Sequence, residues 1–331
     1  MSPGQASGAN IHKLHMPERN RGTTLQLDWL DQVRVNLSAV ERRASTLTTR
    51  RTVKKDWQAA WLLNAVTCID LTTLAGDDTP GRIQRLCAKA RRPVRPDLLR
   101  AMRATDLGIT VGAVCVYHEM VAPAVAALAG SEIPVAAVST GFPAGLSPLN
   151  ARLKEIKASV VAGAKEIDVV INRGHVLTGN WRALYDEVRA FREATGTAQM
   201  KTILGTGDLA TSRNVAKASL IAMMAGADFI KTSTGKEPVN ATLPVSLIMA
   251  RMIRSYREET GHYVGFKAAG GISTAKDALS YLILMKEELG RPWLDSGLFR
   301  IGASSLLTDI ERQIEHHVTG RYSAAYRHPT T

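Results

Sequence analysis

QMKTILGTGDLATSRNVAKASLIAMMAGADFIKT, residues 199–232, contains a complete strand–helix–strand unit. It begins with a short apolar run at 199–204 and ends with a second one at 229–232, and the residues between them, 209–225, have the spacing of a helix. Continuous apolar runs are typical of strands covered on both faces, as in parallel sheets. The stretch therefore predicts two parallel strands joined by a helical crossover.

The same alternation continues on both sides of this unit. The predicted strands are 66–71, 109–117, 135–140, 167–172, 199–204, 229–232, 264–268 and 299–301. The predicted helices are 79–92, 119–128, 148–163, 180–195, 209–225, 244–259, 274–289 and 304–318. Eight strands alternating with eight helices favour an α/β fold, the closed (β/α)8 TIM barrel. A doubly wound open sheet is the alternative, and it is less favoured because no GxGxxG motif follows the first strand.

Segments of different composition flank the predicted barrel. The expected parts, in order, are a flexible N-terminal segment at 1–22, a helical extension at 23–63, the barrel at 64–318 and a mobile C-terminal tail at 319–331. The extension contains two helical patterns, at 28–43 and 54–62. It is expected to pack outside the barrel.

The composition is ordinary for a globular protein, but the charge is not. Hydrophobic residues make up 45% of the chain, and the formal net charge is +12. An excess of basic residues can favour binding to nucleic acid, to a membrane surface or to an anionic metabolite. We find no nucleic-acid-binding motif and no apolar run long enough to span a membrane, so neither partner is expected. The excess of Lys and Arg lies in the first 60 residues and at 82–103, and we interpret it as a solvated basic surface. The alternative from a different class is a nucleic-acid or scaffold protein that uses this basic surface.

The cysteines and the N-terminus bear on compartment and metal binding. The three cysteines, Cys68, Cys87 and Cys115, form no CxxC pair, which argues against a disulfide framework and a structural zinc site. The first residues lack the apolar core of a secretory signal. A cytoplasmic protein without a bound metal is expected.

Polar residues interrupt strands that should fill a barrel with Val, Ile and Leu. They are Asp70 and Thr72 at the first strand, Asp168 in the fourth, Lys201 in the fifth, Lys231 in the sixth and Lys267 in the seventh. Buried charges need a partner or a chemical role. We therefore expect an active site at the C-terminal mouth of the barrel.

Lys231 and Lys267 lie on neighbouring predicted strands, which would be about 4.8 Å apart. Burial and a nearby cation both lower the pKa of a lysine, so that its amine can attack a carbonyl. One lysine would then be the nucleophile and the other the perturbing cation, with Asp168 as a proton shuttle. The alternatives remain open at this point: either lysine could bind phosphate at the rim, and Asp168 could form a structural ion pair.

Small residues follow the last two predicted strands, where barrels of this kind usually bind phosphate. They are Gly270 and Gly271 after the seventh strand, and Gly302, Ala303, Ser304 and Ser305 after the eighth. Small side chains let backbone N–H groups approach an anion, and a helix begins after each loop. Gly235 and Lys236 could add to such a cradle, although tight turns would give similar patterns.

These segments together resemble the 2-deoxy-D-ribose-5-phosphate aldolase family, in its longer, eukaryote-like form. The matching segments are 69–74 (IDLTTL), 166–170 (EIDVV), 225–236 (AGADFIKTSTGK), 264–267 (VGFK), 270–271 (GG) and 302–307 (GASSLL). The match extends over 64–318, and its FIKTSTGK and GFKAAGG segments are highly specific.

The resemblance implies a reversible, metal-free and cofactor-free cleavage of 2-deoxyribose 5-phosphate into acetaldehyde and glyceraldehyde 3-phosphate, in deoxynucleoside catabolism. It makes Lys231 the Schiff-base lysine, Lys267 the lysine that lowers its pKa and Asp168 the acid/base group. The implied substrate contacts are Asp70, Thr72, Cys115, Lys201 and Thr234. The implied phosphate contacts are Gly235, Lys236, Gly270, Gly271, Gly302, Ser304 and Ser305.

Three further expectations accompany the resemblance. The protein should act on a phosphorylated small molecule and form a homo-oligomer, a dimer or larger. In some relatives a tyrosine of the C-terminal tail reaches the active site, and Tyr322 and Tyr326 are the candidates here. Another lysine aldolase, acting on a related phosphorylated sugar or keto-acid, is the nearest alternative within enzymes, because loops and not the barrel set the substrate.

Overall fold

A computed structural model of the chain describes residues 18–328. Its eight strands pair in parallel and in chain order, and β1 also pairs with β8, so the sheet closes into a barrel. The strands are β1 Ile69–Thr72, β2 Ala113–Val116, β3 Val135–Ser139, β4 Glu166–Val170, β5 Gln199–Ile203, β6 Phe229–Lys231, β7 Gly265–Ala269 and β8 Phe299–Ala303. The prediction of a (β/α)8 barrel is confirmed, and the open sheet is excluded.

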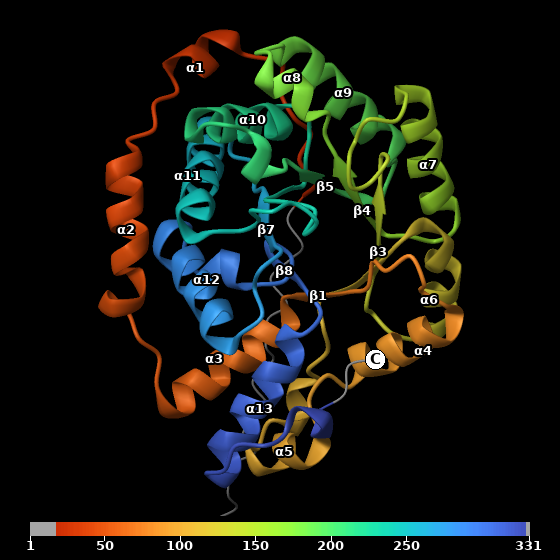
Figure 1. The fold of residues 1–331 in the computed structure, drawn as a ribbon, viewed down its shortest axis with the longest axis vertical. Helices are drawn as coiled ribbons and strands as arrows, with labels where there is room; N and C mark the ends of the chain where they lie inside the picture. The colour runs from red at the N-terminus through yellow and green to blue at the C-terminus, as the bar shows by residue number, and fades with distance from the viewer. Residues whose placement is uncertain (1–17, 329–331) are drawn as a thin grey trace, which may run out of the picture.

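Helices encircle the barrel (Figure 1). Those that follow the strands are α4 Pro80–Arg91, α6 Val121–Ala127, α7 Leu149–Val161, α9 Trp181–Ala194, α10 Ser212–Met224, α11 Leu243–Thr260, α12 Ala275–Glu288 and α13 Leu306–Thr319. Two short helices, α5 Pro96–Ala101 and α8 Arg173–Leu177, are added in the connections. The helix starts are set locally; α12, for example, begins with a capping box between Thr274 and Asp277.

The N-terminal part of the chain differs from its prediction in two places. The helix expected at 28–43 is two helices, α1 Leu27–Gln32 and α2 Leu37–Arg50, because the Asn36 side chain accepts a hydrogen bond from the Ala39 amide and starts a new helix. The first strand was predicted to begin at Val66, but α3 extends over Lys55–Thr67. A short apolar run cannot by itself distinguish a buried helix end from a strand.

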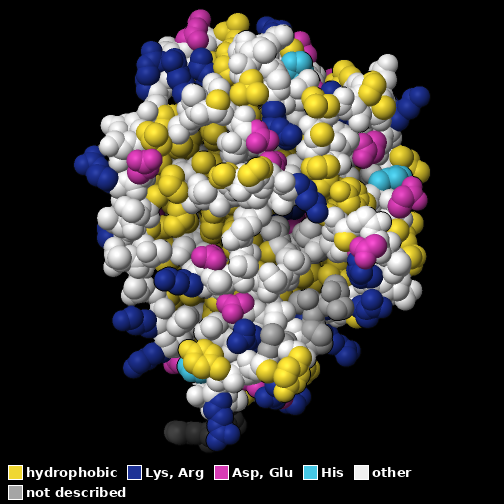
Figure 2. Space-filling model, viewed as in Figure 1, with side chains coloured by type: hydrophobic (Ala, Val, Ile, Leu, Met, Phe, Trp, Pro, Cys, Tyr) yellow, Lys and Arg dark blue, Asp and Glu magenta, His cyan; other side chains and the backbone are white. Residues whose placement is uncertain are grey.

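The extension packs along the outside of the barrel, as Figure 1 shows for α1 and α2. Helix α2 contacts α11 and α12, and α3 contacts α12 and α13. Arg43, Arg50 and Arg51 form ion pairs with Glu287 at this contact. On the face in Figure 2, the Lys and Arg side chains of the described residues are scattered around the rim with Asp and Glu among them, rather than gathered into one patch.

Residues 18–22, expected to belong to a loosely attached segment, are instead fixed to the barrel. The Asn20 side chain is fully buried, and its amide nitrogen donates to the carbonyl oxygens of Met223 (2.8 Å) and Ala227 (2.9 Å). The Asn20 backbone N–H donates to Asp228, the residue before β6. The rest of the predicted flexible segment, residues 1–17, lies outside the described residues.

We expect Asn20→Ala to lower the free energy of unfolding by about 1–3 kcal/mol, because two buried carbonyl groups lose their donor. Urea denaturation followed by circular dichroism measures the change. Asn150→Ala is the control, since Asn150 is exposed in the first turn of α7; its effect should stay within about 0.5 kcal/mol. Equal stability of the two variants would contradict an anchoring role for Asn20.

The C-terminal residues fold back along α13 up to His328, rather than projecting as a tail. The buried His328 ring contacts Glu315 (Nε2–Oε2 2.7 Å), and its carbonyl oxygen accepts a hydrogen bond from Thr308. Tyr322 is 71% exposed and stacks on His316, and Tyr326 is 84% exposed. Neither tyrosine lines the cavity described below.

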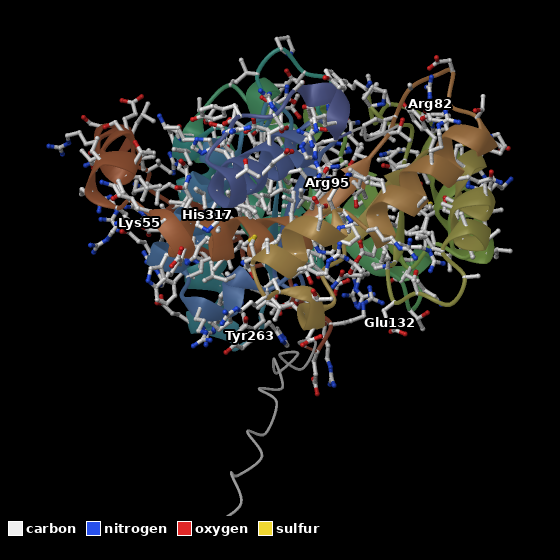
Figure 3. All side chains as sticks on the ribbon, turned by 90° about the horizontal axis from the view of Figure 1, so that it is seen from below. Lys55, Arg82, Arg95, Glu132, Tyr263 and His317 are labelled. Carbon is white, nitrogen blue, oxygen red and sulfur yellow. The ribbon has the colours of Figure 1, made fainter. Side chains whose placement is uncertain are left out.

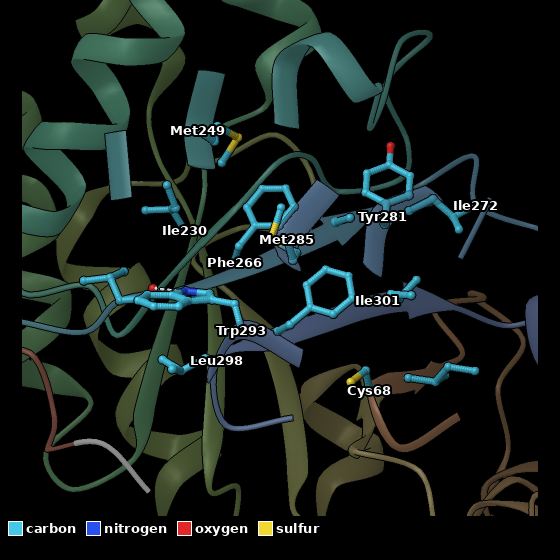
Figure 4. Close-up of a cluster of buried hydrophobic side chains, with 14 of the residues drawn as sticks. Cys68, Ile230, Met249, Phe266, Ile272, Tyr281, Met285, Trp293, Leu298 and Ile301 are labelled. Atoms are coloured by element: carbon cyan, nitrogen blue, oxygen red, sulfur yellow. Dashed lines mark hydrogen bonds between the residues drawn. The ribbon is translucent and has the colours of Figure 1, made fainter. Parts of the chain in front are cut away.

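The main core lies between the barrel and its helices (Figure 4). Ile230 and Phe266 point outward into this layer, where Phe266 stacks on Phe299 with ring centroids 6.3 Å apart. Side chains alternate along a strand. The neighbours of these outward residues, Lys231 and Lys267, therefore point into the barrel.

The two ends of the barrel are separated in Figure 3. Arg82, in the helix that follows β1, lies near one edge of the molecule, whereas Glu132 and Tyr263, which precede β3 and β7, lie near the opposite edge. The first edge carries the C-terminal ends of the strands. This is the end at which barrel enzymes hold their active sites.

Candidate active site

Lys231 and Lys267 are direct register partners on β6 and β7. Their amines meet at one atom: Asp168 Oδ2, from β4, lies 2.8 Å from Lys231 Nζ and 2.7 Å from Lys267 Nζ. All three side chains are buried. The structure thus brings together the three residues that sequence reasoning placed in the chemistry.

A second set of charges surrounds this triad inside the barrel. Asp70 on β1 contacts Lys267 (2.5 Å) and Arg300 (2.5 Å). Glu166 on β4 contacts Arg300 (2.8 Å) and also pairs with Lys201. The result is a closed ionic cluster in which every carboxylate is shared between cations, as buried charges require.

The cluster shifts the pKa values of Lys231 and Lys267 in opposite directions. Burial, together with repulsion from Lys267, lowers the pKa of Lys231, although Asp168 opposes this change. Burial also acts against the charge of Lys267, but Asp168 and Asp70 outweigh it and raise the pKa of Lys267. Burial likewise acts against the charge of Asp168, yet its lysine neighbours hold the pKa of this carboxyl well below the ordinary value. Lys231 is therefore the amine that most readily becomes neutral.

A cavity of about 270 Å³ opens above Lys231, which lines it. The other lining residues are Thr72, Leu74, Thr234, Gly235, Lys236, Ala269, Gly270, Gly271, Ile272, Ser273, Gly302, Ala303, Ser304 and Ser305. The loops after β6, β7 and β8 thus form one wall, which brings together the residues assigned to the phosphate cradle. A small phosphorylated molecule suits a cavity of this size.

Backbone shape allows an anion to approach this wall. Gly270 has φ +80°, and a Cβ atom there would lie 2.5 Å from the Asn240 side chain, so only glycine fits. Ser304 and Ser305 immediately precede α13, whose first amides have no partner within the helix. The positive end of the helix dipole favours an anion at this position.

Some groups assigned to the cradle or to substrate contact have protein partners in this structure. The Gly235 N–H and the Thr234 hydroxyl both donate to Glu237, at 3.1 Å and 2.7 Å. Lys236 Nζ donates to the Leu74 carbonyl oxygen at 3.1 Å. Glu237, which sequence reasoning missed, shapes the loop after β6.

Three residues assigned to substrate contact do not line the cavity. Asp70 and Lys201 are fully buried in the ionic cluster. Cys115 belongs to a small apolar group inside the barrel with Ala136 and Val138, and burial raises the pKa of its thiol. Of the predicted substrate contacts, Thr72 and Thr234 line the cavity.

Arg300 and Glu166, the two remaining members of the cluster, were not among the residues predicted to form the site. Arg300 could have been found by the pattern that indicated the lysines, a charged residue inside an apolar strand, because it lies between Phe299 and Ile301. Across residues 18–328, no group of three or more His, Cys, Asp or Glu side chains is arranged to hold a metal ion. In the same described part, no helix combines the length and apolarity needed to cross a membrane.

Fold and site together define a (β/α)8 barrel enzyme. A buried lysine lies at the edge of a cavity that is lined by glycine-containing loops and by the residues just before helix α13. The sequence model of the DeoC/LacD family of aldolases matches residues 65–309. The chain belongs to this family and is a lyase.

Individual relatives agree with this family. The human protein "Deoxyribose-phosphate aldolase" is 62% identical over 316 residues, covering 95% of this chain and 99% of the human protein. The mouse protein of the same name is 63% identical over 311 residues, covering 93% and 98%. The solved structure "QR15, an Aldolase" superposes with a TM-score of 0.58 at 28% identity, covering 77% of this chain and 97% of that one.

Proposed function

We propose that this chain is a class I aldolase that reversibly cleaves 2-deoxy-D-ribose 5-phosphate into acetaldehyde and D-glyceraldehyde 3-phosphate through a Schiff base on Lys231. The observation that carries this proposal is the Lys231 amine, which lines the cavity, has a lowered pKa and lies 2.8 Å from Asp168. The names of the human and mouse relatives support the substrate.

The first step needs an uncharged amine. Neutral Lys231 attacks the C1 aldehyde of the open-chain sugar to form a carbinolamine, which loses water to become a protonated imine. Lys267 remains charged between Asp70 and Asp168 and thereby disfavours a proton on Lys231. The expected acid limb of the rate profile follows Lys231: activity is lost as the pH falls through the pKa of this amine.

The second step breaks the C2–C3 bond. Asp168, which is within 2.8 Å of the Lys231 amine, accepts the proton of the C3 hydroxyl through a water molecule. The bonding pair moves to C2 and gives an enamine, and glyceraldehyde 3-phosphate leaves. Protonation of C2 and hydrolysis of the imine release acetaldehyde and restore the free lysine. Asp168 returns the proton, so the cycle is balanced.

The phosphate would bind at the far wall of the cavity. Gly270 and Gly271 offer an open backbone after β7, and Ser304 and Ser305 offer hydroxyl groups next to the start of α13. This end anchors the substrate while its aldehyde reaches Lys231. Binding energy from the phosphate can thus orient the reacting carbonyl.

A turnover assay with 2-deoxyribose 5-phosphate tests the proposal. We expect acetaldehyde release, unaffected by EDTA, with kcat/KM for unphosphorylated deoxyribose lower by at least about a hundredfold, because charge-assisted hydrogen bonds contribute about 1.5–3 kcal/mol each. Faster cleavage of a different phosphorylated sugar or of a keto-acid would replace this substrate by the alternative. Strong inhibition by EDTA would point to metal-dependent chemistry.

The remaining proposals follow from the family relationship. We place the enzyme in the cytoplasm and in deoxynucleoside catabolism, and we expect a homo-oligomer of two or more copies. Light scattering of the purified protein decides the last point, since a monomer at micromolar concentration would contradict it.

A further inference from the structure

Arg300 is a buried cation that takes no part in the steps above. The residue is 3% exposed and does not line the cavity, so it would not contact a substrate bound there. Its guanidinium joins two strands across the barrel interior, with one nitrogen 2.5 Å from Asp70 Oδ1 and another 2.8 Å from Glu166 Oε1. Its register partner on β7 is Lys267.

Without Lys231, the positive and negative charges of the cluster are equal in number. The carboxylates are Asp70, Glu166 and Asp168, and the cations other than Lys231 are Lys201, Lys267 and Arg300. Three negative charges therefore face three positive charges in a buried space. A proton on Lys231 would add an unbalanced fourth positive charge, which a low-dielectric interior disfavours.

We propose that Arg300 is a positioning residue whose fixed charge balances the carboxylates of the cluster, so that the Lys231 amine stays uncharged. This inference rests on the proposed Schiff-base function. Without Arg300, three carboxylates would face only Lys201 and Lys267, and a proton on Lys231 would restore the balance. Arg300 also holds one oxygen of Asp70, which leaves the other oxygen to hold Lys267 beside Asp168.

Other titratable groups do not supply this balance. Within residues 18–328, the titratable groups that interact electrostatically with the cluster, besides the seven named, are the thiols of Cys115 on β2 and of Cys68, the residue before β1. Burial raises the pKa of both thiols, to about 12 for Cys68, so both stay neutral near pH 7. Arginine suits the balancing position because its guanidinium stays charged even when buried.

The test measures how pH affects the first step alone. Full-length enzyme is mixed with acetaldehyde and cyanoborohydride, and the initial rate of adduct formation on Lys231 is followed by mass spectrometry from pH 5 to 10. In Arg300→Met we expect the midpoint of this profile to rise by about one unit or more, which is a tenfold loss of neutral amine below the midpoint. KM for the phosphorylated substrate should change little, because Arg300 does not line the cavity.

Two further variants keep the test decisive if Arg300→Met unfolds. Glu166→Gln removes a carboxylate and should move the midpoint downward. The double variant Arg300→Met/Glu166→Gln removes one charge of each sign and should return the midpoint to the wild-type value. An unchanged midpoint in folded Arg300→Met, or an equally raised midpoint in the double variant, would overturn the proposal. Absence of any Lys231 adduct in the wild type would instead refute the proposed function.

Discussion

Lys231→Met should abolish both turnover of 2-deoxyribose 5-phosphate and adduct formation with acetaldehyde. The loss in kcat is expected to be on the order of 10⁴-fold or more, because removal of a covalent nucleophile leaves only binding and electrostatic effects. The fold should survive, since the methionine is similar in length and the change leaves the other three cations to balance three carboxylates. Trapping with cyanoborohydride followed by peptide mass spectrometry gives the direct measurement.

Lys236→Met is the matched comparison. Lys236 also lines the cavity, and its amine donates to the Leu74 carbonyl oxygen rather than to the cluster. This variant should still form the acetaldehyde adduct on Lys231, because acetaldehyde carries no phosphate, while its KM for the phosphorylated substrate should rise. Wild-type adduct yield in Lys231→Met, or an adduct that maps to residue 236 of the wild type, would show that the wrong lysine had been chosen.

The barrel could be predicted from the sequence because its signals are local. Each strand is a short apolar run between turn residues, and eight repeats of the pattern leave few other folds. The same reasoning placed Lys231 and Lys267 on adjacent strands, and their register partnership follows from parallel pairing. The first strand was misplaced because Ala65 and Val66 are buried in a helix end, where composition alone looks like a strand.

The partners inside the barrel could not be predicted in the same way. Arg300 lies 230 positions from Asp70 and 134 from Glu166, and which inward side chains meet depends on the stagger of the closed sheet. The family resemblance assigned Lys201 to the substrate, whereas in the structure it lies within the cluster. A strand sequence shows that a side chain is buried and charged, but not which partner it meets.

The ends of the chain show a second limit of sequence patterns. The polar composition around Asn20 predicts a loosely attached segment. In the structure, however, the Asn20 side chain donates hydrogen bonds to two buried carbonyl groups just before β6. The residues that include Tyr322 likewise fold back along α13 through the buried His328. In both cases a few polar contacts hold the segment, such as Arg19 with Asp228 and Arg327 with Glu315, and hydropathy averages do not detect them.

Asp168→Asn should separate Schiff-base formation from the later proton transfers. An amide cannot accept the proton of the C3 hydroxyl, so kcat should fall by about 10²–10⁴-fold. Asp168 raises the pKa of Lys231, so its loss should lower that pKa further and leave the amine neutral at pH 7. The adduct with acetaldehyde should therefore still form on Lys231, in contrast to the result for Lys231→Met.

Exchange of the acetaldehyde methyl hydrogens in D2O isolates the affected step, because this exchange requires the enamine. Proton NMR should show exchange slowed in Asp168→Asn in proportion to its kcat. Glu166→Gln is the control: it removes a carboxylate from the same cluster that pairs with Lys201 and Arg300 and forms no pair with Lys231. Exchange should be slowed by less than about tenfold there, as expected when no proton-transfer group is lost. Equal losses in the two variants would mean that the charge of the cluster, and not the position of Asp168 beside Lys231, determines the proton transfer.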